Sequence, residues 1–198
     1  GGEAAASLAA ADADGWTPAH IAARQGHEGC LRVLHELGGE AAASLAAADA
    51  DGDTPAHIAA RNGHEGCLRV LHELGGEAAA SVVAADEEGG TPAHAAAQEG
   101  HEGCLRVLHE LGGEAAANLA AVNAHGRTPA HSAAYHGHEG CLRVLHELGG
   151  KAAASVAAAD ADGDTPAHAA AIKGHEGCLR VLHELGGEAA ASLVAATE

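Results

Sequence analysis

Apolar residues recur along this chain with a period of 37 residues, and within each period they follow the spacing of an amphipathic helix. The segment GHEGCLRVLHELGG occurs five times without change, starting at Gly26, Gly63, Gly100, Gly137 and Gly174. In the first copy the pattern predicts a helix from Glu28 to Leu37. Its apolar side carries Cys30, Leu31, Leu34 and Leu37. Repetition at such a period is typical of a helical solenoid.

A shorter helix is predicted ahead of each of these segments. The tetrapeptide TPAH begins it, at Thr17, Thr54, Thr91, Thr128 and Thr165. Threonine suits the N-cap and proline the first helical position, so the first copy starts at Thr17-Pro18. Gly26 ends this helix, because glycine readily adopts the left-handed conformation found after helix C-termini.

Each unit thus consists of an acidic turn, a helix, a turn and a second helix. We therefore expect an all-α repeat solenoid that forms one domain over residues 1–198. Asp12, Asp14 and Gly15 make the acidic turn of the first unit. Residues 1–11 repeat the tail of a unit and form a partial repeat. The complete repeats are 12–48, 49–85, 86–122, 123–159 and 160–196.

The stretch after each pair of glycines is rich in alanine. EAAASLAA follows Gly38-Gly39 and contains strong helix formers. We predict that residues 40–46 and their equivalents form a short third helix. Leu37 lies just before the glycines, and we expect the third helix to cover it.

The segment from Asp12 to Gly38, DADGWTPAHIAARQGHEGCLRVLHELG, closely resembles the ankyrin pattern DxxGxTPLHxAAxxGHxxIVxxLLxxG. The match recurs in all five units. This resemblance implies that His20 of TPAH and His27, with their equivalents, brace neighbouring repeats through hydrogen bonds. It also implies that the turn tips and the exposed positions of the first helix line a concave protein-binding surface.

The chain departs from the ankyrin pattern in three ways. Ankyrin repeats have a period of about 33 residues, whereas these have 37 and carry the extra residues after Gly38-Gly39. The leucine of TPLH is Ala19 here. The second leucine of LLxxG is His35, and the usually polar position before the glycine is Leu37.

The charge balance limits the classes of partner. Lys and Arg number 10 against 28 Asp and Glu, which gives a net charge of −18 with histidines neutral. Nucleic acids and anionic membranes are therefore not expected partners, because their binding depends on Lys and Arg contacts. No apolar run reaches the roughly 18 residues needed to span a membrane. An acidic protein favours a basic protein partner.

The cysteines do not form a disulfide framework. They are Cys30, Cys67, Cys104, Cys141 and Cys178, one in each repeat. Stacked helices lie about 8–10 Å apart, which exceeds the roughly 7 Å between Cα atoms that a disulfide spans. We interpret them as small buried residues of an intracellular, cytoplasmic protein in a reducing compartment.

No catalytic, cofactor-binding or metal-binding residues are predicted, and we expect no enzyme activity. His27 and Cys30 are zinc-ligand types, but two ligands per unit are too few. The run Asp49 to Asp53 lacks the glycine and glutamate spacing of a calcium loop, so we interpret it as a solvated turn. Cys30 and His35 have no orienting partner for nucleophilic catalysis. Moreover, every candidate group recurs five times, whereas an active site is normally a single constellation.

The repeats differ mainly at the turn tips and at the end of the first helix. Under the ankyrin resemblance these positions face the concave surface, and aromatic residues and arginine are common at binding hot spots. Neutral drift at exposed positions would give the same pattern, so both interpretations stay open. The candidate partner-binding residues are Trp16, Arg24, Gln25, Asp53, Arg61, Asn62, Gln98, Glu99, Arg127, Tyr135, His136, Asp164, Ile172 and Lys173.

Two other function classes compete with a protein-binding scaffold. Near-perfect repetition and the absence of methionine favour a purely structural array, either designed or excised from a longer protein. Seventeen histidines favour a metal or pH responder.

The terminal repeats keep the same apolar residues as the interior ones. We therefore expect end-to-end self-association, weakened by polar substitution of Leu182 or Leu185.

Overall fold

The computed structural model describes residues 8–186, and every regular element within them is helical. The first helices of the repeats are α2 (Pro18–Arg24), α5 (Pro55–Arg61), α8 (Pro92–Glu99), α11 (Pro129–His136) and α14 (Pro166–Lys173). The second helices are α3 (Glu28–Leu37), α6 (Glu65–Leu74), α9 (Glu102–Leu111), α12 (Glu139–Glu147) and α15 (Glu176–Glu184). Among the described helices, none combines the length and apolar character that crossing a membrane requires.

A short third element follows the second helix of four repeats. These elements are α4 (Gly39–Ala43) with the 3-10 helix η1 (Ser44–Ala46), α7 (Gly76–Ser81), α10 (Gly113–Ala117) with η2 (Asn118–Ala120), and α13 (Gly150–Ser155). The third helix predicted over residues 40–46 is thus confirmed there. Its equivalent in the fifth repeat lies outside the described residues.

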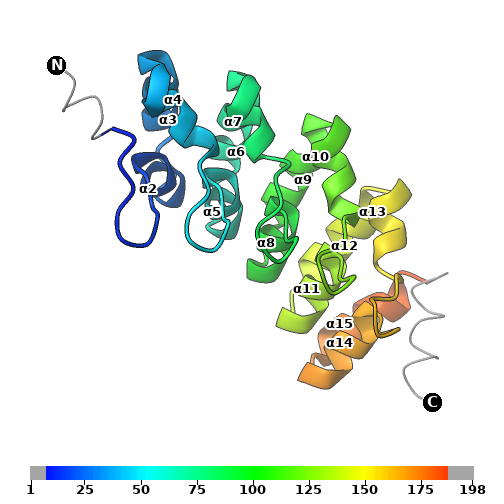
Figure 1. The fold of residues 1–198 in the computed structure, drawn as a ribbon. Coiled ribbons are helices and arrows are strands. Elements are labelled where there is room, and N and C mark those ends of the chain that lie inside the picture. The colour runs from blue at the N-terminus through cyan, green and yellow to red at the C-terminus, as the bar shows by residue number, and fades with distance from the viewer. Residues whose placement is uncertain (1–7, 187–198) are drawn as a thin grey trace.

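The repeats stack into a curved array (Figure 1). First helices pack on first helices of neighbouring repeats, and second helices pack on second helices. The array bends so that α2, α5, α8, α11 and α14 lie on the inner, concave side, while α4, α7, α10 and α13 lie on the outer side (Figure 1). The all-α solenoid predicted from the sequence is therefore confirmed.

Local sequence explains where the first helices begin. In each repeat the threonine of TPAH and the histidine three residues later form a capping box, and proline occupies the first turn. The N–H group of Thr17 donates to Nδ1 of His20, at 3.2 Å. This bond satisfies one of the backbone donors that a helix start leaves without an intrahelical partner.

The core consists of alanine and leucine layers. Leu31 and Leu34 of α3 are buried, together with the alanines of α2 that face them. Because alanine side chains are small, the two helices approach closely, and few large side chains are needed to fill the space between them. A chain almost without aromatic residues can build a continuous core in this way.

Leu37 is not covered by the third helix, which corrects the expectation from the sequence. Its side chain is 56 % exposed, whereas Ala41 and Leu45 of the third helix are buried without covering it. The reason is helical spacing, since Cys30, Val33 and Leu37 share one face and Leu31 lies on another. In later repeats the equivalents of this face meet the preceding repeat.

Two rows of histidine hydrogen bonds join successive repeats. Nε2 of His20, His57, His94 and His131 each lies 2.9–3.2 Å from a backbone carbonyl oxygen 33 residues further along. Nε2 of His64, His101, His138 and His175 each lies 2.8–3.0 Å from a carbonyl oxygen 40 residues earlier. The predicted bracing role of these histidines is confirmed.

Arginine–glutamate pairs bridge the second helices at the surface. The pairs are Arg32–Glu73, Arg69–Glu110, Arg106–Glu147 and Arg143–Glu184. Each partner is roughly half exposed, so each pair contributes only a small amount to stability. Their regular spacing instead supports one fixed register between neighbouring repeats.

Candidate functional site

A shallow hollow of about 300 Å³ opens on the concave side of repeats 3 to 5. Helices α8, α11 and α14 and the turns that precede α11 and α14 supply its walls. Six of the predicted partner-binding residues line it: Gln98, Arg127, Tyr135, His136, Asp164 and Ile172. The structure therefore brings together side chains from three repeats that lie far apart in the sequence.

The aromatic and aliphatic side chains of the hollow come from the ends of α11 and α14. Tyr135 is partly exposed, and the ammonium group of Lys173 lies 4.3 Å from its ring centroid, over the ring. The imidazole of His136 meets the Tyr135 ring edge-on, with 5.1 Å between centroids. The side chain of Ile172 is 69 % exposed. Such a cluster offers both apolar contact area and polar edges to a ligand.

Arg127 and Asp160 form an ion pair at the edge of the hollow. Nε of Arg127 donates to Oδ2 of Asp160, at 3.2 Å. Burial alone would raise the pKa of Asp160, but the Arg127 guanidinium and the backbone N–H groups of Asp162 and Asp164 outweigh it. The pKa of Asp160 therefore lies below its usual range, and the carboxylate stays charged. Arg127 is thus held by its own protein and presents a partly neutralised cation.

The other predicted residues lie outside this hollow. Trp16 is near the opposite end of the array, where its ring lies 5.4 Å from the guanidinium carbon of Arg24. Asn62 donates to the Ile58 carbonyl oxygen within its own repeat. Gln25 and Glu99 are exposed at the ends of their helices. The predicted set is therefore spread along the array, and only six of its members share this hollow.

Asp53 is misplaced in the predicted set. The residue is only 4 % exposed, and its Oδ2 atom accepts a hydrogen bond from Arg61, at 2.6 Å. The backbone of the turn is the same as in the other repeats, and the ion pair holds the Asp53 side chain against the end of α5. Asp53 and its partner Arg61 therefore present less side chain to a ligand than their sequence position predicts.

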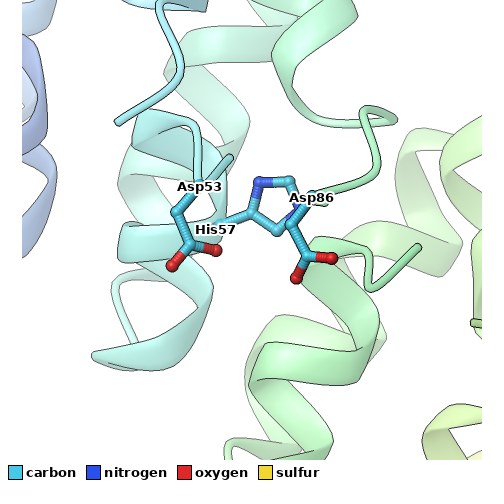
Figure 2. Close-up of side chains that lie close together, drawn as sticks. All are labelled: Asp53, His57 and Asp86. Atoms are coloured by element: carbon cyan, nitrogen blue, oxygen red, sulfur yellow. The ribbon is translucent and has the colours of Figure 1, made fainter. Parts of the chain in front are cut away.

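A second cluster lies at the boundary between repeats 2 and 3. Asp53, His57 and Asp86 each offer one ligand atom, and these atoms lie within 4.8 Å of one another. Figure 2 shows the His57 ring between the two carboxylates. The sequence analysis predicted no metal-binding residues and did not identify this cluster.

The hydrogen bonds of His57 fix its tautomer. The Thr54 N–H group donates to Nδ1, at 3.1 Å, so Nδ1 is an acceptor. Nε2 therefore carries the proton and donates to the Gly90 carbonyl oxygen, at 3.2 Å. Burial lowers the pKa of His57, so the ring is held neutral. Both ring nitrogens are engaged with the backbone.

The hollow also includes Glu88, His125, Ser132 and Ala169, which were not in the candidate set. Their positions vary among the repeats, and the same signal that selected the other candidates also marks them. The Asp53–Asp86 pair has no local signal, because its members come from different repeats.

A comparison with protein-family models identifies the family. The family described as "Ankyrin repeats (3 copies)" matches residues 3–81, 76–156 and 114–192. The chain belongs to the ankyrin-repeat family. Ankyrin repeats generally mediate protein–protein interaction and are typically non-enzymatic. A search of curated proteins finds no significant match to this chain.

Membership in the ankyrin-repeat family gives both histidine rows a structural role. The TPAH histidine and the histidine of the Gly-His step bond backbone carbonyl groups of neighbouring repeats. The ankyrin fold thereby occupies eight of the chain's histidines, and the candidate binding surface lies on the concave side instead.

Proposed function

We propose that this ankyrin-repeat protein is a non-catalytic scaffold that binds a protein segment in the concave hollow of repeats 3 to 5. The observation that carries the proposal is the position of the variable residues. Arg127, Tyr135 and Ile172 differ from their equivalents in other repeats and meet in one hollow, whereas the second helices are identical. Packing does not require such differences, so recognition is the role that we assign to them.

A rigid surface favours this mode of binding. The hollow is built on helices whose register the histidine bonds fix, for example His131 Nε2 to the Asp164 carbonyl oxygen, at 3.0 Å. A preformed surface loses little conformational entropy when a ligand binds. Arg or Lys side chains of a ligand can extend toward the acidic groups of the hollow.

The favoured partner is a basic peptide segment with an apolar anchor. Glu88 and Asp164 line the hollow, and the whole chain carries a net charge of −18. This field attracts cationic segments and raises their association rate at low salt. Ile172 and Tyr135 supply the apolar contacts. We also propose an intracellular, cytoplasmic location, because all five cysteines are free thiols.

The test is a selection from a random peptide library displayed on phage, with the full chain as bait. We expect enrichment of Lys- and Arg-rich peptides that carry an aliphatic or aromatic residue. Their synthetic versions should bind in fluorescence anisotropy and weaken at least about tenfold with Y135A/I172A, as hot-spot residues do. V122A is the matched control, because Val122 is an exposed aliphatic residue outside the hollow.

The outcome of the control decides the proposal. Binding that is unchanged in Y135A/I172A would indicate nonspecific attraction to an acidic surface, because neither substitution alters the charge of the chain. Enrichment of acidic peptides, or no enrichment at all, would favour the purely structural array.

End-to-end self-association is a second candidate, supported by the face of repeat 1 that points away from repeat 2. Ile21, Cys30, Val33 and Leu37 are exposed there around a hollow of about 780 Å³. The equivalent Ile58, Cys67 and Val70 are buried against repeat 1. Inside the array, the preceding repeat covers the equivalent face. The surface that fits the exposed face of repeat 1 is therefore that of another repeat of the same kind.

We propose that a second copy supplies that face from its repeat 5. Leu179 is partly exposed, whereas its equivalents in repeats 1 to 4 are fully buried. Continuing the internal register would place Arg180 beside Glu36 of the second copy, as Arg143 lies beside Glu184. The Leu182 suggested from the sequence is unsuitable for a test, because it is fully buried within its own repeat.

Two complementary variants test this candidate by sedimentation. V33D blocks the face of repeat 1 that points away from repeat 2, and L179D blocks the face of repeat 5 that points away from repeat 4. Each variant alone should be monomeric, whereas an equimolar mixture should form dimers and nothing larger. V122D should associate like the unmodified chain. A strictly monomeric unmodified chain at high concentration would refute the candidate.

A further inference from the structure

We propose that Asp53 and Asp86 hold a calcium ion at the boundary between repeats 2 and 3. The proposal is independent of the protein-binding hollow, which lies on repeats 3 to 5. It rests on a comparison between equivalent boundaries of the same array, on a buried carboxylate oxygen without a partner, and on the proximity of the two carboxylates.

The equivalent boundary between repeats 4 and 5 shows what these positions hold elsewhere. Arg127 occupies the position of Asp53, and Asp160 occupies the position of Asp86. There, the guanidinium of Arg127 pairs with Oδ2 of Asp160, at 3.2 Å. In repeat 2 the arginine is replaced by an aspartate while the facing aspartate is kept. One boundary therefore has a cation opposite a carboxylate, and the other has two carboxylates opposite each other.

The Asp53 carboxylate is only half satisfied. Oδ2 is paired with Arg61, at 2.6 Å, but Oδ1 is buried and has no hydrogen-bond partner. Leaving a buried oxygen of a charged group unpaired is costly. Figure 2 shows the carboxylates of Asp53 and Asp86 flanking the His57 ring, one from each repeat. A bound cation would supply the missing partner.

Asp86 has a free oxygen available for the same ion. Its Oδ1 atom accepts the backbone N–H groups of Glu88, at 2.9 Å, and of Gly90, at 2.7 Å. These bonds fix the carboxylate within its turn, and neither of them uses Oδ2. The equivalent oxygen of Asp160 accepts the hydrogen bond from Nε of Arg127. The two carboxylates are thus held in place by their own repeats rather than by each other.

The ligand set and the spacing favour calcium. The ligand atoms lie within 4.8 Å of one another, and two oxygens that bind one Ca²⁺ at about 2.3–2.6 Å are at most about 4.6–5.2 Å apart. Magnesium demands near-ideal octahedral geometry and gives up its waters reluctantly, whereas calcium accepts irregular oxygen sites. Zinc and nickel favour imidazole, but Nδ1 and Nε2 of His57 are both engaged with the backbone.

We expect weak binding, because the protein offers two carboxylates and water must complete the coordination. Arg61 further reduces the net negative charge of the site. A dissociation constant on the order of 10⁻⁴–10⁻³ M is typical of weak calcium sites. The ion would tie the turn of repeat 2 to the turn of repeat 3 and so strengthen that boundary.

The experiment measures calcium binding to the full chain by isothermal titration calorimetry in about 0.15 M KCl, which screens diffuse attraction to the acidic surface. We expect one site per chain. D86N should weaken binding at least about tenfold, because calcium affinity follows the number of charged ligands. D51N is the matched control, because Asp51 is an exposed acid on the same turn, and its affinity should equal that of the unmodified chain.

A second variant keeps the test valid if D86N folds poorly. D53R places a guanidinium opposite Asp86, as Arg127 lies opposite Asp160, and should therefore bind no calcium; far-UV circular dichroism checks its folding, because Arg61 loses its partner Asp53. Its thermal midpoint should not respond to calcium, whereas that of the unmodified chain should rise. Absence of one-site binding in the unmodified chain, or equal binding in D53R, overturns the proposal. Stoichiometric zinc uptake in preference to calcium overturns it as well.

Discussion

The Nε2–H group of His94 in repeat 3 donates to the backbone carbonyl oxygen of Arg127 in repeat 4, at 2.9 Å. On the other side of the same ring, Nδ1 accepts the N–H group of Thr91, at 3.2 Å. One neutral imidazole therefore caps its own helix and joins two repeats. Since the His94 side chain is buried, it contributes to stability both as a helix cap and as a link between repeats.

Replacing His94 by alanine should destabilise the array. The substitution leaves the buried Thr91 N–H group without its acceptor and opens a cavity, which together cost about 2–4 kcal/mol. Denaturant unfolding followed by circular dichroism measures the loss. H109A is the control, because His109 is exposed on the second helix of the same repeat and should change stability by less than about 0.5 kcal/mol. Similar losses in both variants would contradict the bracing role.

Stability should also fall in acid. Burial lowers the pKa values of His94 and His131, despite raising effects from their bonded carbonyl groups and from Asp86 and Asp160. Below the unfolded-state pKa of about 6.5 the unfolded chain binds protons that the folded chain does not. The stabilisation is thus fully present above this pH and is lost as pH falls toward the lower folded-state pKa values.

The measurement is the urea midpoint at several values between about pH 7.5 and pH 5.5. We expect a steady decrease in the midpoint over this interval. A variant with the exposed His35, His72 and His109 replaced by glutamine should show the same slope. If that variant loses the pH dependence, the buried histidines are not its source.

Much of the fold followed from local sequence. Thr17, Pro18 and Gly26 gave the bounds of the first helix, because capping and helix termination depend on neighbouring residues alone. The exposure of Leu37 could not be predicted in this way. It depends on which face of α3 meets a preceding repeat, and Leu37 in repeat 1 has no such neighbour among the described residues.

The candidate site was predictable only in part. Tyr135 and Ile172 were found because their positions vary among otherwise identical repeats. Asp53 was placed on the open surface by the same reasoning, yet it is buried, because Arg61 and the turn of repeat 3 enclose it. Variation marks positions where packing does not restrict the residue type. It does not show when the residue at such a position becomes buried by contacts of its own, because those contacts involve residues that are distant in the sequence.

Alanine substitution at two equivalent glycines should separate backbone strain from side-chain conflict. Gly100 and Gly174 both have positive φ, at 81° and 75°. A Cβ on Gly100 would lie 2.6 Å from Nδ1 of His138, whereas at Gly174 no described atom lies within 4 Å. G174A should therefore cost only the left-handed strain of about 1–2 kcal/mol.

G100A should cost more than G174A in the same unfolding assay. Its new methyl group displaces the His138 ring, which donates to the Gln98 carbonyl oxygen, at 2.8 Å. The expected excess is about 1–3 kcal/mol, the usual range for overpacking together with a lost hydrogen bond. Equal losses in the two variants would show that the ring moves aside without cost.

The cysteines should differ sharply in reactivity although their local sequences are identical. Cys30 is exposed, whereas Cys67, Cys104, Cys141 and Cys178 are buried. Burial raises the pKa of Cys104 and of Cys141 to about 12, and that of Cys67 and of Cys178 to about 11. The thiolate is the reactive form, so four thiols are protected both by burial and by protonation.

Treatment of the native chain with a thiol reagent such as dithionitrobenzoate near pH 8 should therefore modify one thiol rapidly, and denaturant should make all five reactive. C30S should remove the fast phase and leave the slow phase unchanged. C104S should do the reverse, losing one slow thiol and keeping the fast one. A fast phase that persists in C30S would mean that an interior repeat boundary opens readily, which contradicts the continuous packing of the array.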